Sequence, residues 1–330
     1  MTPASSPRHV CITGALGFIG RRLAAHYRAA GVRVTGVDLR AEPALAVLAG
    51  DLTAPGDWQR AFAGADLVVH TAALVGMGSD EAAFWRANCL ATRHVLDAAA
   101  AAGVGRLVHL SSIVAFGFDY PDGVDERYPL RPNGVPYVDT KIASEQLVLQ
   151  AHAAGEVPCT IVRPGDVYGP DSHFWTLSPL RTIAAGRMVL PAMGQGHLSP
   201  VFVDDLVDGI VRAGGAPEAA GHIFTVTGGD TITANVFFGH YARMLGKASV
   251  PVAPTALVVA LAATLGRLLG DSDVTPAAAR YVARRGGYSI AKARARLGYS
   301  PAVDLAEGMR RIEAWARASG IVPGTPGPTT

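Results

Sequence analysis

The sequence predicts an α/β fold, in which a doubly wound parallel sheet is followed by a smaller, mainly helical part. Short apolar segments alternate with helical patterns throughout the first half of the chain, and this rhythm is typical of parallel βαβ units. Segments such as LVVH at 67–70 and VHLS at 108–111 contain no Asp, Glu, Lys or Arg, as expected for strands covered on both faces. A glycine-rich turn at 13–20 joins the first such segment to the first helix.

The elements of the first half can be placed in order along the chain. The strands that we expect are 9–13, 33–38, 66–73, 106–112 and 159–164. The helical patterns between them are 20–31, 57–64, about 88–102 and the stretch around 137–141. Pro164 ends the last of these strands, since proline cannot continue a strand ladder.

The regular alternation loosens after Gly169 and Pro170. A helix is expected around 178–186, and VFVDDLVDGIVRA at 201–213 begins another helical pattern. We therefore predict a nucleotide-binding domain at 1–170, to which 200–228 return, and a substrate-binding part at 171–320. Residues 321–330, rich in Pro and Gly, are expected to form a flexible tail.

Composition excludes several classes of protein. The 330-residue chain carries 29 basic and 27 acidic residues, without the basic and aromatic clusters of nucleic-acid-binding surfaces. Cys11, Cys89 and Cys159 lie far apart in sequence, which predicts buried reduced thiols rather than disulfides or a metal site. The first nine residues contain no apolar segment, so we expect no secretory signal and a cytoplasmic protein.

One apolar stretch resembles a membrane segment. Residues 248–266 contain no charged residue, but Pro251 and Pro254 interrupt them. The helix that remains, about 255–269, is too short to cross a bilayer. We expect a buried or pocket-lining helix without a transmembrane span, and peripheral membrane contact is the alternative.

The turn TGALGFIG predicts a dinucleotide site because it lies between a strand and a helix. Gly14 permits the tight turn, Gly17 lets the backbone approach a pyrophosphate, and Gly20 allows close packing of helix and strand. Asp38 ends the next strand, where a carboxylate accepts hydrogen bonds from the ribose hydroxyls. This carboxylate favours NAD over NADP, although Arg40 could pair with a 2′-phosphate.

The stretch YVDTK at 137–141 predicts a catalytic pair. Tyr137 and Lys141 are four residues apart and share one face of a helix. A cation beside the phenol lowers its pKa from about 10. Tyr137 would then exchange protons near neutral pH, whereas the alternative is an ordinary surface pair without a catalytic role.

These motifs together resemble those of the extended short-chain dehydrogenase/reductase family, also called the NAD-dependent epimerase/dehydratase family. The resemblance extends from about Val10 to Gly246 and includes further motifs: GDLT at 50–53, HTAA at 70–73, SSIVAFG at 111–117, RPGDVYGP at 163–170 and FVDDL at 202–206. It implies a Rossmann-type domain that holds NAD and a smaller C-terminal portion that closes over the substrate. It also implies a homodimer.

The resemblance implies a role for each matching residue. Tyr137 is the general acid-base, Lys141 is its electrostatic partner, and Ser112 hydrogen-bonds the substrate oxygen in preference to its neighbour Ser111. The residues that would contact the cofactor are Gly14, Gly17, Phe18, Ile19, Gly20, Asp38, Arg40, Asp51, Leu52, Thr71, Ala72, Ala73, Asn88, Tyr137, Lys141, Pro164 and Gly165. Asp51 and Leu52 correspond to adenine contacts, and Pro164 and Gly165 to contacts with the nicotinamide amide.

Two departures from the sugar-nucleotide enzymes of the family bear on the reaction. Ile113 and Val114 stand where the dehydratases carry an Asp-Glu pair, which disfavours elimination of water. No arginine lies between residues 194 and 204 to bind a diphosphate, and His197 in that stretch is expected to be a solvated loop residue.

The apolar character of 236–238 and 255–266 favours a hydrophobic substrate. The combination resembles the 3β-hydroxysteroid dehydrogenase-like branch and implies interconversion of alcohol and ketone on a steroid, terpenoid or β-keto compound. One alternative is a nucleotide-sugar 4-epimerase with tightly bound NAD, in which Arg181 or Arg187 would contact the diphosphate. Another is a dinucleotide-binding sensor without turnover.

Overall fold

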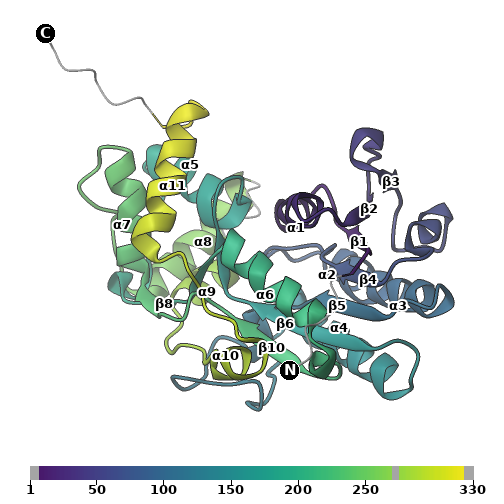
Figure 1. The fold of residues 1–330 in the computed structure, drawn as a ribbon. Coiled ribbons are helices and arrows are strands. Elements are labelled where there is room, and N and C mark those ends of the chain that lie inside the picture. Colours follow the sequence, from purple (N-terminus) through teal and green to yellow (C-terminus); the bar gives the residue numbers. More distant parts are fainter. Residues whose placement is uncertain (1–6, 270–274, 323–330) are drawn as a thin grey trace, which may run out of the picture.

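One parallel sheet organises the computed structural model, which describes residues 7–269 and 275–322 (Figure 1). Its seven strands lie in the order β10-β6-β5-β4-β1-β2-β3. Their bounds are β1 His9–Thr13, β2 Arg33–Asp38, β3 Val47–Ala49, β4 Leu67–His70, β5 Arg106–Leu110, β6 Cys159–Pro164 and β10 Ile223–Val226. The α/β fold with a doubly wound parallel sheet is therefore confirmed.

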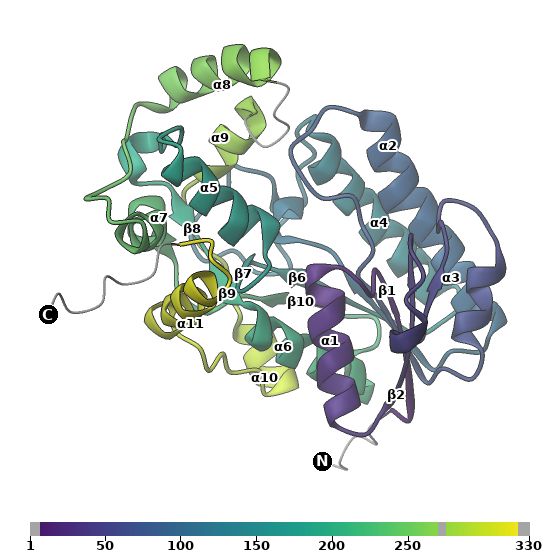
Figure 2. The same ribbon diagram turned by 90° about the horizontal axis from the view of Figure 1, so that it is seen from above.

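Helices cover both faces of the sheet, as the uncharged strands predict. Helices α1 (Phe18–Ala29) and α6 (Val203–Gly215) lie on one face, and α3 (Ala91–Ala101) and α4 (Pro136–Ala153) lie on the other (Figure 2). Alternate residues of β1 enter the two resulting cores. Val10 and Ile12 pack with the α1 and α6 side chains, whereas Cys11 packs with those of α3 and α4. Cys11, Cys89 and Cys159 are buried free thiols, as predicted.

The strand order reverses between β1 and β4. β1 pairs with β2 on one side and with β4 on the other, and the chain then continues outward in both directions. Connections on opposite faces diverge at such a point and leave a crevice at the carboxyl ends of the strands, which is where parallel sheets bind ligands.

Residues after β6 build a second layer beside the sheet (Figure 2). Its helices are α5 Ser178–Ala184, α7 Ala234–Met244, α8 Thr255–Leu269, α9 Pro276–Val282 and α11 Leu305–Ala318, whereas α10 Ala291–Leu297 packs against β10 and α6. Its short strands are β7 Asp166–Tyr168, β8 His197–Leu198, β9 Pro200–Phe202 and β11 Ile232–Thr233. β10 leaves this layer and pairs with β6 at the edge of the main sheet.

Two predicted helices differ from those observed. The helix expected from about 88 already begins with α2 (Glu81–Trp85), because the Asp80 carboxylate caps the Ala83 amide, and a π-helical turn at Arg86–Leu90 joins α2 to α3. The pattern at 57–64 forms only a 3₁₀ helix at Asp57–Phe62. The domain limits remain predictions, and 323–330 of the predicted tail lie outside the described residues. Within the described ranges, every helix is too short or too polar to span a membrane.

Candidate active site

A cavity of about 1170 Å³ extends from the glycine turn to the helices of the second layer. Most residues predicted from the sequence line it: Gly14, Gly17, Phe18, Ile19, Gly20, Asp38, Arg40, Asp51, Leu52, Thr71, Ala72, Ala73, Ser112, Tyr137, Lys141, Pro164 and Gly165. One cavity therefore brings together groups that are up to about half the chain apart in sequence.

The glycine turn fits its position closely. Gly14 has a φ of +69°, and a Cβ there would lie 2.8 Å from the backbone nitrogen of Ala72. A Cβ on Gly20 would lie 2.1 Å from the carbonyl oxygen of Gly14, so any larger residue would push α1 away from β1. Gly17 directly precedes the first turn of α1, which contains no acidic residue. The free amides of this turn form a site for an anionic group.

Asp38 lies at the carboxyl end of β2, where its carboxylate is held in a fixed orientation. Oδ2 accepts a hydrogen bond from the Leu16 amide at 2.9 Å, and Oδ1 accepts one from the Leu39 amide at 2.8 Å. Each oxygen keeps a lone pair for a further donor. Arg40 is exposed and also lines the cavity, so a carboxylate and a guanidinium are both available at this end.

Tyr137 and Lys141 lie on the first two turns of α4, and Ser112 follows β5 and caps a 3₁₀ turn. Burial raises the pKa of Tyr137 to about 12, and a hydrogen bond with Ser112 opposes this shift. The Nζ atom of Lys141 donates to the Leu110 carbonyl at 2.8 Å and lies 5.9 Å from the Tyr137 ring centroid. The pKa of Tyr137 is therefore raised and not lowered as predicted, because burial disfavours the phenolate more than the hydrogen bond with Ser112 favours it.

Glu145, which the sequence analysis missed, lies one turn after Lys141 on α4. Burial lowers the pKa of Lys141 to about 8, and the Glu145 charge opposes this shift. The carboxylate pairs with Arg163 through Nη2 at 2.6 Å and Nε at 2.8 Å, and it accepts the Ser111 hydroxyl at 2.5 Å. Ser111 also lines the cavity, but its hydroxyl is donated to Glu145, whereas Ser112 is the serine that hydrogen-bonds Tyr137. The repeated four-residue spacing could have identified Glu145.

Two other predicted positions need correction. Asn88 is buried and is not among the residues that line the cavity; its amide binds the backbone of Leu74 on both sides and the Thr140 hydroxyl at 3.1 Å. It holds the loop after β4 against α4 instead of facing a ligand. His197 is not a solvated loop residue, because it lies in β8 and its Nδ1 accepts the Gly286 amide at 3.1 Å.

The second layer supplies the remainder of the cavity wall, which is largely apolar. Its apolar lining residues include Phe174, Trp175, Met188, Val189, Leu190, Phe238, Val258, Leu261, Ala262, Ala278, Ala279, Tyr281 and Val282. Of the stretch 236–238, only Phe238 lines the cavity, whereas Phe237 belongs to the core. Arg181 and Arg187 are exposed and also line this half, and no carboxylate among the described residues lines it with them.

A buried ion pair supports this apolar wall from behind. Arg284 contacts Asp166 at 2.5 Å, and both side chains are fully buried. The Tyr281 hydroxyl donates to Asp166 at 2.7 Å, and the Arg284 guanidinium lies 3.7 Å from the centre of the Tyr281 ring. Since Tyr281 lines the cavity, the pair fixes one side of the space beside Tyr137.

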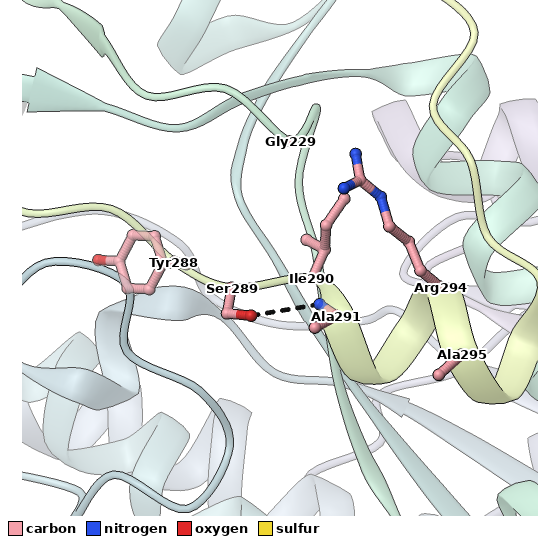
Figure 3. Close-up of a pocket in the computed structure, with 7 residues that line it drawn as sticks. All are labelled: Gly229, Tyr288, Ser289, Ile290, Ala291, Arg294 and Ala295. Carbon is pink, nitrogen blue, oxygen red and sulfur yellow. Dashed lines mark hydrogen bonds between the residues drawn. The ribbon is translucent and has the colours of Figure 1, made fainter.

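A smaller cavity of about 530 Å³ lies beside α10 and contains none of the predicted site residues (Figure 3). It is lined by Gly229, Tyr288, Ser289, Ile290, Ala291, Arg294 and Ala295. The Ser289 hydroxyl there accepts the Ala291 amide at 3.2 Å, which is a local turn contact. The titratable side chains that line it, Tyr288 and Arg294, are not among the predicted catalytic residues, which lie in the larger cavity.

Comparison with known proteins agrees with this geometry. Residues 10–227 match the family model described as the NAD dependent epimerase/dehydratase family. A 2-alkyl-3-oxoalkanoate reductase of Stenotrophomonas maltophilia is 27% identical over 94% of this chain and 99% of its own length. The 4-hydroxy-2-methyl-3-oxo-4-farnesyl-3,4-dihydroquinoline-1-oxide ketoreductase of Stigmatella aurantiaca is 29% identical over 94% of this chain and 98% of its own. A dTDP-glucose 4,6-dehydratase of Streptomyces griseus is 30% identical over 93% of both.

Similar proteins are also found for the predicted 3β-hydroxysteroid dehydrogenase-like branch and for the fold. A 3beta-hydroxysteroid-dehydrogenase/decarboxylase of Arabidopsis thaliana is 28% identical over 76% of this chain and 62% of its own. The epimerase Mth375 of Methanothermobacter thermautotrophicus superposes with a TM-score of 0.81 at 22% identity, over 96% of this chain and 94% of its own, and shows the shared fold. The family model covers residues 10–227, and the glycine turn, Tyr137 and Lys141 line one cavity. The chain therefore belongs to the NAD-dependent epimerase/dehydratase family of extended short-chain dehydrogenases/reductases.

Proposed function

We propose that the protein is an NAD-dependent oxidoreductase that interconverts a secondary alcohol and a ketone on a hydrophobic substrate. The observation that carries the proposal is the shared cavity: Ser112, Tyr137 and Lys141 lie between a dinucleotide turn and a largely apolar wall. A reactive carbon held there meets a hydride donor on one side and a proton donor on the other. An apolar wall with few polar groups suits a bulky hydrophobic molecule.

The residues present fit an NAD molecule. The amides at the start of α1 would hold the pyrophosphate, Asp38 the adenosine ribose, and Asp51 and Leu52 the adenine edge. The cradle is shaped for close backbone approach, since a Cβ at Gly14 or Gly20 would collide with its surroundings. When bound, NAD supplies or accepts the hydride, and the chemistry of the protein concerns the proton on the substrate oxygen.

The proton transfer rests on Tyr137. Burial raises the pKa of Tyr137 to about 12, so its hydroxyl is neutral. In the reductive direction this hydroxyl donates its proton to the oxygen of the ketone. Ser112 donates a second hydrogen bond to the same oxygen and stabilises the charge that develops there. Lys141 keeps a positive charge close to both groups below its pKa of about 8 and makes loss of the Tyr137 proton easier. Glu145 helps Lys141 to remain charged.

The names of two relatives support β-keto compounds and similar ketones as substrates. The reductase of Stenotrophomonas maltophilia is named for 2-alkyl-3-oxoalkanoates, and the Stigmatella aurantiaca enzyme for a farnesylated quinoline ketone. Both names describe a ketone that carries an apolar chain. The apolar wall formed by α7, α8 and α9 supports a substrate of this kind for this chain.

A nucleotide-sugar 4-epimerase is the second candidate. Arg181 and Arg187 line the substrate half of the cavity, where guanidinium groups could bind a diphosphate. The relationship to a dTDP-glucose 4,6-dehydratase supports this alternative. Dehydration itself stays disfavoured, because Ile113 and Val114 are fully or almost fully buried apolar residues and supply no acid or base.

A spectrophotometric screen tests the proposal. Purified protein is mixed with NADH and with 2-alkyl-3-oxoalkanoates, terpenoid ketones or steroid ketones, and with NAD and UDP- or dTDP-sugars in parallel. We expect NADH consumption with at least one hydrophobic ketone. Turnover of a nucleotide sugar alone, without net change in NADH, would establish the epimerase in place of the reductase. Cytoplasmic location and the homodimer remain predictions.

The pH profile of ketone reduction should depend on Lys141. We expect kcat to fall as the pH rises through about 8, because Lys141 then loses its positive charge. The Lys141→Arg variant keeps its charge beyond pH 10, since an arginine pKa lies above ~12. It should have a lower kcat but no decline between pH 7 and 10. An identical alkaline decline in both proteins would assign it to another group.

Coenzyme preference should depend on Asp38. In Asp38→Ser the repulsion between the carboxylate and a 2′-phosphate is removed, while Arg40 remains to pair with that phosphate. We expect the ratio of kcat/KM for NADPH to that for NADH to rise by about 10- to 100-fold, equivalent to ~1.4–3 kcal/mol. The double variant with Arg40→Ala should lose most of this gain. An unchanged ratio in Asp38→Ser would exclude Asp38 as the ribose contact.

A further inference from the structure

Helix α8 is apolar on both of its sides. Residues 248–266 contain no charged residue. Val258 and Ala262 are buried and line the cavity. Leu261 also lines it but is 40% exposed, and Leu257 is 52% exposed and does not line it. Figure 2 shows α8 at the edge of the molecule, outside α9. A helix that is apolar all round is normally buried, so its outer side needs a partner.

Neighbouring segments extend this apolar surface. The Met193 amide donates to the Ala253 carbonyl at 3.1 Å, which brings the loop after α5 against the start of α8. A Cβ on Gly194 would lie 3.0 Å from Asn235 and 3.1 Å from Val252, so the beginning of α7 meets the same place. The exposed apolar side chains of these segments form what we call the rim patch: Met193, Val236, Val252, Leu257 and Leu261.

The charged residues of the two segments that form the rim patch have one sign. The two segments that form it, 172–203 and 231–266, contain neither Asp nor Glu, although the chain has 27 acidic residues elsewhere. Their charged residues are Arg181, Arg187, Arg243 and Lys247. Apolar side chains with only basic charges in the same segments are the pattern of helices that lie in the headgroup region of a bilayer.

We infer that the rim patch docks on the surface of a membrane that contains anionic lipids. Anionic headgroups complement the basic residues, and the outer leucines of α8 enter the boundary between headgroups and acyl chains. A second copy of the chain would place like charges against each other. An acidic protein surface would leave the apolar centre of the patch without an apolar partner. The observations thus favour a lipid surface over both.

The position of the patch has a consequence for substrate access, which rests on the proposed function. Val258 and Ala262 of α8 line the catalytic cavity, Leu257 belongs to the rim patch, and the half-exposed Leu261 belongs to both. A hydrophobic ketone dissolved in the bilayer would therefore enter the cavity along α8 without crossing water. Docking would raise the rate on membrane-dissolved ketones and leave the rate on water-soluble ketones unchanged.

Vesicle binding by the full-length protein tests the docking. Co-sedimentation is measured with vesicles of phosphatidylcholine alone and of phosphatidylcholine with phosphatidylglycerol in equal amounts. We expect binding to the anionic vesicles to be stronger by about tenfold or more and to weaken with added salt. The double variant Met193→Gln/Leu257→Gln should lose about tenfold in this binding, because two apolar side chains no longer enter the bilayer.

Leu90→Gln is the matched control, because Leu90 is also an exposed leucine but lies in the turn before α3, away from the rim patch. It should bind vesicles like the wild type. Absence of binding by the wild type, equal binding by the double variant, or capture of an acidic protein without any vesicle binding would overturn the inference. Activity on a water-soluble ketone, measured in parallel, separates the two proposals, since vesicle binding without turnover would refute only the reductase.

Discussion

Replacing Tyr137 with phenylalanine should reduce the rate of ketone reduction by about 10²- to 10⁴-fold, the usual contribution of a positioned proton donor. The ring would keep its contact with Phe84, whose centroid lies 6.2 Å away, so the fold and the cavity should persist. Only the hydroxyl that shares a hydrogen bond with Ser112 is lost. The measurement is NADH consumption under saturating ketone, together with NAD affinity by calorimetry, which should change by less than about threefold.

Tyr128→Phe provides the control, because Tyr128 packs against Phe116 outside the cavity. It should retain turnover. If Tyr137→Phe kept full turnover, Tyr137 could not be the proton donor. A variant without turnover that still fulfilled the biological role of the protein would instead support a dinucleotide-binding sensor, which would have no need of Ser112, Tyr137 and Lys141 together.

Replacing Arg284 with methionine should lower the free energy of unfolding by about 3–5 kcal/mol, because the buried Asp166 carboxylate would lose the cation with which it is paired. Asp166 would keep hydrogen bonds from the Tyr281 hydroxyl and the Ser199 amide, but not the charge opposite it. The loss is measured by urea denaturation followed by circular dichroism. Arg212→Met, which removes the half-exposed pair with Asp208, should cost no more than about 1 kcal/mol.

The double variant Asp166→Asn/Arg284→Met distinguishes this cause from poor packing. It should regain part of the stability lost in Arg284→Met, because no unpaired charge is then buried. Equal stability of Arg284→Met and Arg212→Met would show that the buried pair contributes no more than a surface pair. Since Tyr281 lines the cavity, a rise in KM for the ketone should accompany the loss of stability.

The main features of the fold follow from local sequence patterns. Strands covered on both faces can be predicted from uncharged apolar segments. The tight turn after β1 can be predicted from Gly14, whose φ of +69° favours glycine. The sequence pattern places the start of this helix near residue 88, whereas α2 begins at Glu81. Asp80, directly before EAAFW, is a capping residue that could have indicated the earlier start. The π-helical turn that follows has no comparable signature in the residues themselves.

The candidate site was predictable where its residues lie in motifs and not where they meet only in space. Asp166 and Arg284 are 118 positions apart, so no local pattern indicates their ion pair. The pKa of Tyr137 was predicted in the wrong direction, because four-residue spacing gives proximity to Lys141 but not the degree of burial. Asn88 was assigned to the cofactor region, whereas its amide is used by Leu74 and Thr140.

Isotope transfer tests the central proposal that the cavity reduces a ketone by direct hydride transfer with Tyr137 as the acid. The protein is incubated with a 2-alkyl-3-oxoalkanoate and NADH deuterated at both positions of nicotinamide C4, and the product is analysed by mass spectrometry and NMR. We predict deuterium on the new carbinol carbon, in step with the amount of NADH consumed. Product without deuterium, or NADH that remains unconsumed while a nucleotide sugar is epimerised, would contradict the proposal.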